Sequence, residues 1–233
     1  MADRPVMLIT GASTGIGAAT ARHAARDGFR VALAARSADR LEGLSRELNQ
    51  DGDAIAVSTD VTDFAAQEAL VVRTLEAFGR LDVAFANAGF GATRGFLEET
   101  PEQWREMVLT NVLGAAYTIR ATLPALRETA EQGHVLLTSS VAGRRVLPGS
   151  LYSATKHAVT AMAEALRQEL RNAGDRIRVT CIEPGMVDTP FFSQRPENAL
   201  QPDDIARAVL YAVQQPPHVD VNEVLIRPTS QPG

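Results

Sequence analysis

The sequence has little of several residue types on which common protein chemistries depend. A single cysteine, Cys181, excludes an intramolecular disulfide and a thiol-rich metal site. The four histidines show no metal-ligand spacing and no H-E-x-x-H sequence occurs, so we predict no metal site. The first apolar run, Val6–Ile9, is too short for a signal-peptide core or a membrane span. We therefore expect a soluble, cytoplasmic protein.

The sequence also lacks an excess of basic residues. The 23 Lys and Arg side chains against 28 Asp and Glu give a net charge of −5, which argues against a nucleic-acid or membrane-surface partner. Hydrophobic residues make up 45% of the 233 positions, enough for a large core. No linker, low-complexity tract or internal repeat interrupts the chain, so we predict one domain over residues 1–233.

Short apolar runs alternate with longer amphipathic segments along the chain. The expected strands are Val6–Ile9, Val31–Ala35, Ala54–Val57, Val83–Ala86, Val135–Leu137, Ile177–Ile182 and Val224–Ile226. The expected helices are Ile16–Asp27, Ala38–Asn49, Ala65–Phe78, Pro101–Leu126, Tyr152–Asn172 and Asp203–Gln214. This alternation predicts an α/β fold, a Rossmann-type doubly wound parallel sheet of about seven strands with helices on both faces.

Two of the expected helices carry polar residues at informative positions. Along the first, an apolar stripe at helical spacing comprises Trp104, Val108, Asn111, Ala115 and Ile119. The Asn111 amide on this stripe needs hydrogen-bond partners. In the second, Tyr152 and Lys156 are four residues apart, so a phenol and an amine project from the same face.

The first expected strand leads through a glycine-rich turn directly into a helix. The turn reads Thr10-Gly11-Ala12-Ser13-Thr14-Gly15-Ile16-Gly17. Amides at a helix amino terminus carry positive partial charge, and glycines let a phosphate approach them, so this turn is a candidate pyrophosphate site. Its spacing differs from G-x-G-x-x-G, and a tight connection without a ligand remains the alternative.

The second expected strand ends in Ala34-Ala35-Arg36-Ser37, where dinucleotide sites contact the adenosine ribose. No carboxylate is available there to accept from a free 2′-hydroxyl. Arg36 can pair with a 2′-phosphate through charge-assisted hydrogen bonds, so we predict NADP(H) rather than NAD. A solvated surface arginine is the alternative.

Six motifs, in this order and spacing, together resemble the short-chain dehydrogenase/reductase family. They are Thr10-Gly11-x-x-x-Gly15-Ile16-Gly17, Asn87-Ala88-Gly89, Asn111, Ser140, Tyr152-x-x-x-Lys156 and Pro184-Gly185, and they span nearly the whole chain. Tyr-x-x-x-Lys alone is too short to be specific. The six motifs together, in this order and spacing, are specific. The resemblance implies a nicotinamide cofactor and a homodimer or homotetramer formed through the long helices.

The resemblance also assigns a catalytic group of Asn111, Ser140, Tyr152 and Lys156. Hydride transfer to a carbonyl leaves an alkoxide that must receive a proton, and Tyr152 is the candidate donor. The Lys156 ammonium would lower the pKa of the phenol. In the family the lysine also holds the nicotinamide ribose, the serine binds the substrate oxygen, and the asparagine supports a proton-relaying water.

The choice of serine is ambiguous because Thr138-Ser139-Ser140 offers three hydroxyls. Ser140 stands three residues before Gly143, as the family's serine does, but its interval to Tyr152 is one residue shorter than the family's. Ser139 has the usual interval and remains the alternative.

Three further segments complete the cofactor site that the resemblance implies. Asp60 and Val61 would contact adenine, and Asn87-Ala88-Gly89 would line its ribose. The carboxamide of the nicotinamide would be held by Pro184, Gly185, Val187 and Thr189. Each segment also has an alternative as an ordinary turn or strand break.

The substrate pocket of the family would be walled here by Phe90, Leu147, Met186, Phe191 and Phe192. Arg144, Arg145 and Arg195 in the same loops either contact an acidic group of the substrate or are solvated. The stretch from Val221 to Thr229 resembles the end of NADP-dependent 3-hydroxy acid and serine dehydrogenases, which points to small polar hydroxy or oxo compounds.

We therefore predict an NADP(H)-dependent oxidoreductase that interconverts a small-molecule secondary alcohol and a carbonyl compound, with Tyr152 as general acid/base. The alternative from another class is a cofactor-binding regulatory protein of the same fold. A regulator would keep Gly11, Gly15, Gly17 and Arg36 but has no need of Tyr152.

Overall fold

A computed structural model describes residues 4–49, 53–91, 95–191 and 196–231. Its strands are β1 (Val6–Thr10), β2 (Arg30–Ala35), β3 (Ala54–Ser58), β4 (Val83–Ala86), β5 (His134–Thr138), β6 (Arg178–Pro184) and β7 (Glu223–Ile226). Its longer helices are α1 (Gly15–Arg26), α2 (Ala38–Leu48), α3 (Phe64–Phe78), α4 (Pro101–Val108), α5 (Gly114–Thr129), α6 (Tyr152–Ala173) and α7 (Pro202–Val213). Each expected strand and helix is present, with ends that differ by a few residues.

The strands of the described chain form one parallel sheet in the order β3-β2-β1-β4-β5-β6-β7. The order runs outward from β1 to β3 and then restarts at β4 on the other side of β1. At such a switch point the connections after β1 and β4 leave in opposite directions, which opens a crevice at the carboxyl ends of the strands.

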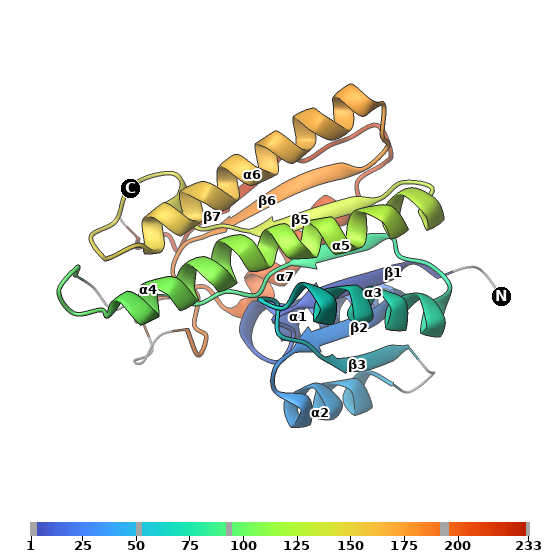
Figure 1. Cartoon of the computed structure of the whole chain (residues 1–233), viewed down its shortest axis with the longest axis horizontal. Helices are drawn as coiled ribbons and strands as arrows, with labels where there is room; N and C mark the ends of the chain where they lie inside the picture. Colours follow the sequence, from blue (N-terminus) through green and yellow to red (C-terminus); the bar gives the residue numbers. More distant parts are fainter. Residues whose placement is uncertain (1–3, 50–52, 92–94, 192–195, 232–233) are drawn as a thin grey trace.

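Helices cover both faces of the sheet, and each face has its own apolar core. Figure 1 looks onto the face that carries α3, α5 and α6, with α1 and α7 behind the sheet. Successive residues of a strand point to opposite faces, so Leu8 packs in the core under α3, α5 and α6, while Ile9 packs in the core with α1 and α7. Strands buried on both faces explain why the runs are continuously apolar.

The segment expected as one helix from Pro101 to Leu126 contains a π-helical turn, η1 (Leu109–Leu113), between α4 and α5. The prediction that Val108 lies on the buried stripe is wrong, because Val108 is 40% exposed and Met107 takes the buried position. A π-turn holds an additional residue, which shifts the helical phase on one side of it relative to the other. Asn111 lies in this turn and is buried.

None of the helices that the structure describes is long and apolar enough to cross a membrane.

Candidate active site

A cavity of about 730 Å³ lies at the carboxyl ends of the central strands. Most of the residues predicted for the site line it. These are Gly11, Ser13, Thr14, Gly15, Ile16, Arg36, Ser37, Asp60, Val61, Asn87, Ala88, Gly89, Ser140, Tyr152, Lys156, Pro184, Gly185, Val187 and Thr189. Gly17 and Asn111 are not among the lining residues; Gly17 packs against Gly11, and Asn111 forms hydrogen bonds with Phe90, both of which line the cavity.

The glycine-rich turn lines the cavity and leads directly into α1. Thr14 is the residue before α1, and its side chain makes no capping hydrogen bond among the described residues. The first amides of α1 are therefore available to an anion. At Gly17 a Cβ would lie 2.3 Å from the carbonyl oxygen of Gly11, so only glycine lets α1 start this close to the turn.

Asn87 holds the ends of three strands together beneath the cavity. Its Nδ2 donates to the Thr10 carbonyl oxygen at 3.0 Å, and its Oδ1 accepts from the Thr138 hydroxyl at 3.1 Å. The Thr10 hydroxyl in turn accepts from the backbone N–H of Asn87 at 3.0 Å. These contacts join the ends of β1, β4 and β5, so the Asn87 amide fixes the shape of the cavity at this point.

Two arginines lie where the cavity passes the end of β2. Arg36 follows β2 directly, and both Arg36 and Arg40 line the cavity, Arg40 from the first turn of α2. Hydrogen bonds from Thr62 are the main cause that lowers the pKa of the nearby Asp60, and the Arg36 charge adds to this effect. Arg40 was not predicted from the sequence, although its place in the first turn of the helix that begins next to Arg36 was a usable signal.

Tyr152 begins α6 and faces into the cavity, next to Ser140 at the end of β5. Burial raises the pKa of Tyr152 to about 12, and a hydrogen bond with Ser140 acts in the opposite direction. Ser140 also accepts from the N–H of Ala142 at 3.1 Å, which fixes its hydroxyl at the start of the short helix η2 (Val141–Gly143).

The neighbouring Ser139 is oriented differently. Its hydroxyl donates to the Lys156 carbonyl oxygen at 2.9 Å and lies 2.8 Å from the Thr160 hydroxyl. Both of these partners belong to α6, so the polar capacity of Ser139 is used inside the protein. Ser140 is the serine that contacts Tyr152.

Lys156 lies one helical turn after Tyr152 on the same side of α6. Its Nζ is 5.8 Å from the centre of the Tyr152 ring and donates to the Thr138 carbonyl oxygen at 2.8 Å. Burial lowers the pKa of Lys156 to about 8. The amine is thus held at the cavity wall with part of its hydrogen-bonding capacity committed to β5.

Asn111 fastens the π-turn to the loop after β4. Its Oδ1 accepts from the N–H of Phe90 at 3.0 Å, and its Nδ2 donates to the carbonyl oxygen of Phe90 at 2.9 Å and to Thr155 at 3.2 Å. The amide therefore has the partners that its buried position demands. It positions Phe90, which lines the cavity, and joins it to Thr155 on α6.

Comparison with known proteins decides the family. The sequence profile of the short chain dehydrogenase family matches residues 5–200. This chain belongs to the short-chain dehydrogenases. An uncharacterised oxidoreductase of Staphylococcus haemolyticus is 42% identical to it over 227 residues, 96% of each chain.

Solved structures of this family superpose over nearly the whole chain. An alcohol dehydrogenase from the archaeon Thermococcus sibiricus, complexed with 5-hydroxy-NADP, is 38% identical with a TM-score of 0.90 and 98% coverage of both chains. Serine dehydrogenase from Escherichia coli is 30% identical with a TM-score of 0.86, covering 98% of this chain and 100% of its own. A Burkholderia phymatum member in complex with NAD is 29% identical, with a TM-score of 0.88 over 96% of this chain and 89% of its own.

The far side of the cavity of this short-chain dehydrogenase is mainly apolar. The predicted wall residues Phe90, Leu147, Met186 and Phe191 line it, as does Arg145. Phe192 and Arg195 lie outside the described residues. Gln231, which the sequence analysis did not single out, also lines the cavity, and its Oε1 accepts from the N–H of Met186 at 3.0 Å.

Arg144 does not line the cavity, and its side chain is 37% exposed to solvent. It forms ion pairs with Glu183 on β6 and Glu223 on β7. Cys181 is buried in the short-chain dehydrogenase, as expected, and burial raises the pKa of its thiol to about 12. A thiol held in the protonated form is a poor nucleophile.

Proposed function

We propose that this short-chain dehydrogenase is an NADP(H)-dependent reductase that interconverts a small-molecule secondary alcohol and a carbonyl compound. The observation that carries the proposal is the meeting of Ser140, Tyr152 and Lys156 in one cavity with the glycine-rich turn and Arg36. A regulatory protein that only bound the dinucleotide would need the glycine-rich turn and Arg36, but it would not need Ser140, Tyr152 and Lys156.

The cavity fits a dinucleotide along its length. The amides at the start of α1 suit a pyrophosphate, and Gly17 lets α1 begin close against the glycine-rich turn. Pro184, Gly185, Val187 and Thr189 also line the cavity, and the nicotinamide carboxamide would lie against them. When bound, the reduced nicotinamide supplies the hydride.

The residues of the chain supply the proton and the geometry. The hydroxyls of Ser140 and Tyr152 would donate hydrogen bonds to the carbonyl oxygen of the substrate, which orients the carbonyl carbon toward the cofactor. Tyr152 would transfer its proton to the alkoxide oxygen as negative charge develops there. Lys156, at 5.8 Å from the ring, would stabilise the phenolate that results. Alcohol oxidation would use the same groups in reverse, with the phenolate as base.

NADP(H) is favoured over NAD(H) by the charge at the end of β2. Arg36 and Arg40 both line the cavity there and suit a 2′-phosphate. Similar proteins have been solved with either kind of cofactor, 5-hydroxy-NADP in the Thermococcus sibiricus enzyme and NAD in the Burkholderia phymatum protein. The preference therefore rests on these arginines.

The first experiment measures NADPH oxidation against a panel of aldehydes, ketones, β-keto esters and diketones, with NADH in parallel. Turnover that requires NADPH and is lost in Tyr152→Phe supports the proposed reductase. Tight NADPH binding without turnover across the panel would instead favour the regulatory protein.

A charge-reversal pair tests the cofactor preference. Arg36→Asp is expected to weaken NADPH binding at least tenfold more than NADH binding, because a carboxylate repels the 2′-phosphate. Arg46→Asp, on α2 but outside the cavity lining, is the matched control and should affect neither cofactor. Equal losses of both cofactors in Arg36→Asp would contradict the 2′-phosphate role.

We also propose that the protein is a homodimer or homotetramer formed through the long helices, by analogy with the family. The exposed Val108 at the end of α4 is consistent with such a contact. Light scattering at several protein concentrations measures the assembly directly, and a monomer throughout would contradict it.

A further inference from the structure

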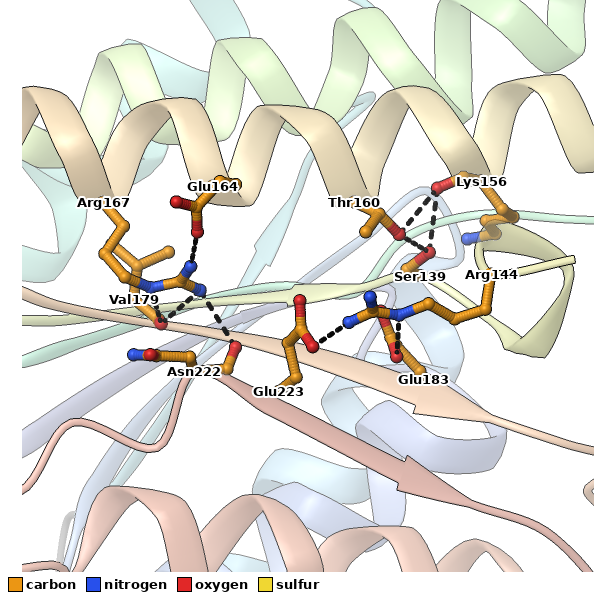
Figure 2. A network of polar contacts seen from close by, with 10 residues as sticks. All are labelled: Ser139, Arg144, Lys156, Thr160, Glu164, Arg167, Val179, Glu183, Asn222 and Glu223. Atoms are coloured by element: carbon orange, nitrogen blue, oxygen red, sulfur yellow. Dashed lines mark hydrogen bonds and ion pairs between the residues drawn. The ribbon is translucent and has the colours of Figure 1, made fainter.

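A buried carboxylate lies next to the cavity wall that Pro184 forms. Glu183, on β6, has no exposed surface, yet it immediately precedes Pro184, which lines the active-site cavity. The Nε of Arg144 donates to both of its carboxylate oxygens, at 2.8 and 2.7 Å. A second ion pair joins Arg144 to Glu223 on β7, and Figure 2 shows the guanidinium between the two carboxylates.

This ion triad is attached to the turn that carries Ser140. Helix η2 begins after Ser140 and ends at Arg144, whose N–H donates to the Val141 carbonyl oxygen at 3.1 Å. At its start, the Ser140 hydroxyl oxygen lies 3.4 Å from the Pro184 carbonyl oxygen. Both ends of η2 therefore contact adjacent residues of β6, one end through the Ser140 hydroxyl and the other through an ion pair.

The triad also connects to the backbone of Lys156. The Cys181 thiol lies next to Glu183 and Thr160, and both side chains affect its pKa. Thr160 donates to the Lys156 carbonyl oxygen at 3.1 Å, where Ser139 donates as well. Figure 2 shows the polar contacts among Ser139, Thr160 and Lys156 close to the Arg144 ion pairs.

Helix η2 packs directly against the polar contacts between Ser139 and Lys156. A Cβ at Gly143 would lie 2.3 Å from the Ser139 hydroxyl and 2.7 Å from the Lys156 carbonyl oxygen. Such close packing means that a shift of η2 is transmitted to both Ser140 and the first turns of α6.

We propose that Arg144 and Glu183 are positioning residues, which hold the Ser140 hydroxyl against Tyr152 by anchoring η2 to β6. Only Glu183 of this triad is buried, whereas the Arg144 and Glu223 side chains are partly exposed. Ion pairs with an exposed partner, and buried carboxylates that must be desolvated, contribute little net stability, so stability alone is a weak reason for this triad. Their directional geometry fixes the position of a group, which is what the Ser140–Tyr152 contact requires. The inference rests on the catalytic role proposed above for Ser140 and Tyr152.

The first test is Glu183→Met, which removes the anchor without leaving a buried charge, since Arg144 keeps Glu223 as a partner. We expect kcat to fall about tenfold because the Ser140 hydrogen bond is lost from the reacting geometry. KM for NADPH should stay within about twofold, because the glycine-rich turn and Arg36 are untouched. Glu183→Gln keeps a hydrogen-bond acceptor for Arg144 and should recover most of kcat, which also provides a readable variant if the methionine protein folds poorly.

In Glu183→Met, the pKa of Tyr152 should change in opposite directions for the two possible roles of Glu183, a positioning role through Ser140 and a direct effect of its charge. The charged or titratable groups of the described chain that contact Glu183 are Arg144, from the end of η2, and Cys181, on β6; Glu223, on β7, shares Arg144. Removing the Glu183 charge by itself would lower the pKa of Tyr152. Losing the Ser140 hydrogen bond would raise it. We expect the rise, seen as a shift to higher pH of the acid limb of kcat/KM for alcohol oxidation.

A second readout does not need a substrate. The chain has three tyrosines, so NMR with isotope-labelled tyrosine Cζ gives few signals, and the Tyr152 signal is the one lost in Tyr152→Phe. Glu183→Met should change the chemical shift and raise the titration midpoint of this signal. If wild-type turnover did not depend on Tyr152, the proposed function would fail, whereas the NMR titration would still test the anchor.

Arg80→Met is the matched control. Arg80 forms an ion pair with the buried Asp82 at the opposite end of the sheet, just before β4. This variant should lower the free energy of unfolding while leaving the Tyr152 signal and kcat unchanged. An unaltered or lowered pKa of Tyr152 in Glu183→Met, or a kcat no lower than that of Arg80→Met, would overturn the proposal.

Discussion

The ring of Phe191 lies edge-on to the ring of Tyr152, with the ring centroids 5.6 Å apart and the planes at 64°. Tyr152 comes from the start of α6, whereas Phe191 comes from the segment after β6. The contact helps to exclude water from the phenol, whose pKa burial raises to about 12. A residue of the predicted substrate wall thus affects the acidity of the proposed proton donor.

Removing this ring should make Tyr152 more acidic. In Phe191→Ala water reaches the phenol, so the pKa of Tyr152 falls toward its ordinary value. Alcohol oxidation needs the phenolate, which exists above that pKa, so the acid limb of kcat/KM should move to lower pH. The measurement is the pH profile of NADP⁺ reduction. Phe191→Leu keeps an apolar cover and serves as the control; a profile identical in all three proteins would contradict the effect.

The two adjacent serines should give different phenotypes. Ser140→Ala should lower kcat by about 10²-fold, because its hydroxyl contacts Tyr152 and would bind the substrate oxygen, and losing the cap of η2 should lower the free energy of unfolding by about 1 kcal/mol. Ser139→Ala should lower the free energy of unfolding by about 1–3 kcal/mol, since it leaves buried partners on α6 without their hydrogen bonds. Turnover and urea unfolding measure the two effects. A larger loss of kcat in Ser139→Ala would reassign the catalytic serine.

Lys156 is expected to lower the stability of the folded protein, although turnover requires it. Burial lowers its pKa to about 8 from 10.5, so the folded state disfavours the ammonium. This penalty is fully present below pH 8 and disappears as the pH rises from about 8 to 10.5, the range in which the unfolded chain binds the additional proton. Lys156→Met should therefore unfold with a free energy about 1–3 kcal/mol higher than wild type at pH 7, and lose turnover.

Urea unfolding of both proteins across that pH range measures the linkage. The difference in stability should shrink as the pH rises above 8. A constant difference would show that Lys156 is not penalised by burial. Lys156→Arg, which keeps the charge, is the control for the loss of turnover and should not show the gain at pH 7.

His134 should make the fold sensitive to acid. Its Nε2 lies 2.8 Å from the Thr180 hydroxyl, which itself donates to the Val221 carbonyl oxygen at 2.6 Å. Thr180 thus accepts from Nε2–H, and Nδ1 is buried without a hydrogen-bond partner among the described residues. Burial lowers the pKa of His134 to about 3 from 6.5.

The unfolded chain binds a proton on His134 between these two pKa values and the folded chain does not, so stability falls as the pH drops below 6.5. The slope attributable to His134 is about 1.4 kcal/mol per pH unit. His134→Gln removes this group and should flatten the dependence of unfolding free energy on pH between about 6 and 4. Equal slopes in the two proteins would contradict the assignment.

The strand pattern predicted the sheet well, because strands covered on both faces are continuously apolar and alternate with helices of sufficient length to cross back. The Pro101–Leu126 segment was less predictable. A π-turn leaves the residue types unchanged and depends on what the turn packs against, so periodicity placed Val108 in the core where the structure has Met107. The glycine-rich turn and the pairing of Tyr152 with Lys156 on one helix face follow from local spacing, whereas their predicted roles came from the joint arrangement of the six motifs.

Arg144 shows where the sequence was insufficient. Its place in a loop near the predicted pocket suggested solvent or substrate, but its partners Glu183 and Glu223 come from strands some 40 and 80 residues later in the chain. Likewise, spacing left Ser139 and Ser140 undecided, whereas the structure orients Ser139 toward α6 and Ser140 toward Tyr152.

The sequence by itself determined the order of strands and helices, the glycine-rich turn and the spacing of Tyr152 and Lys156, because these depend on neighbours within one or two helical turns. Only the tertiary structure decided which hydroxyl meets Tyr152 and which carboxylates hold Arg144. Those contacts join residues far apart in the chain, and their formation depends on how β5, β6, β7 and α6 pack.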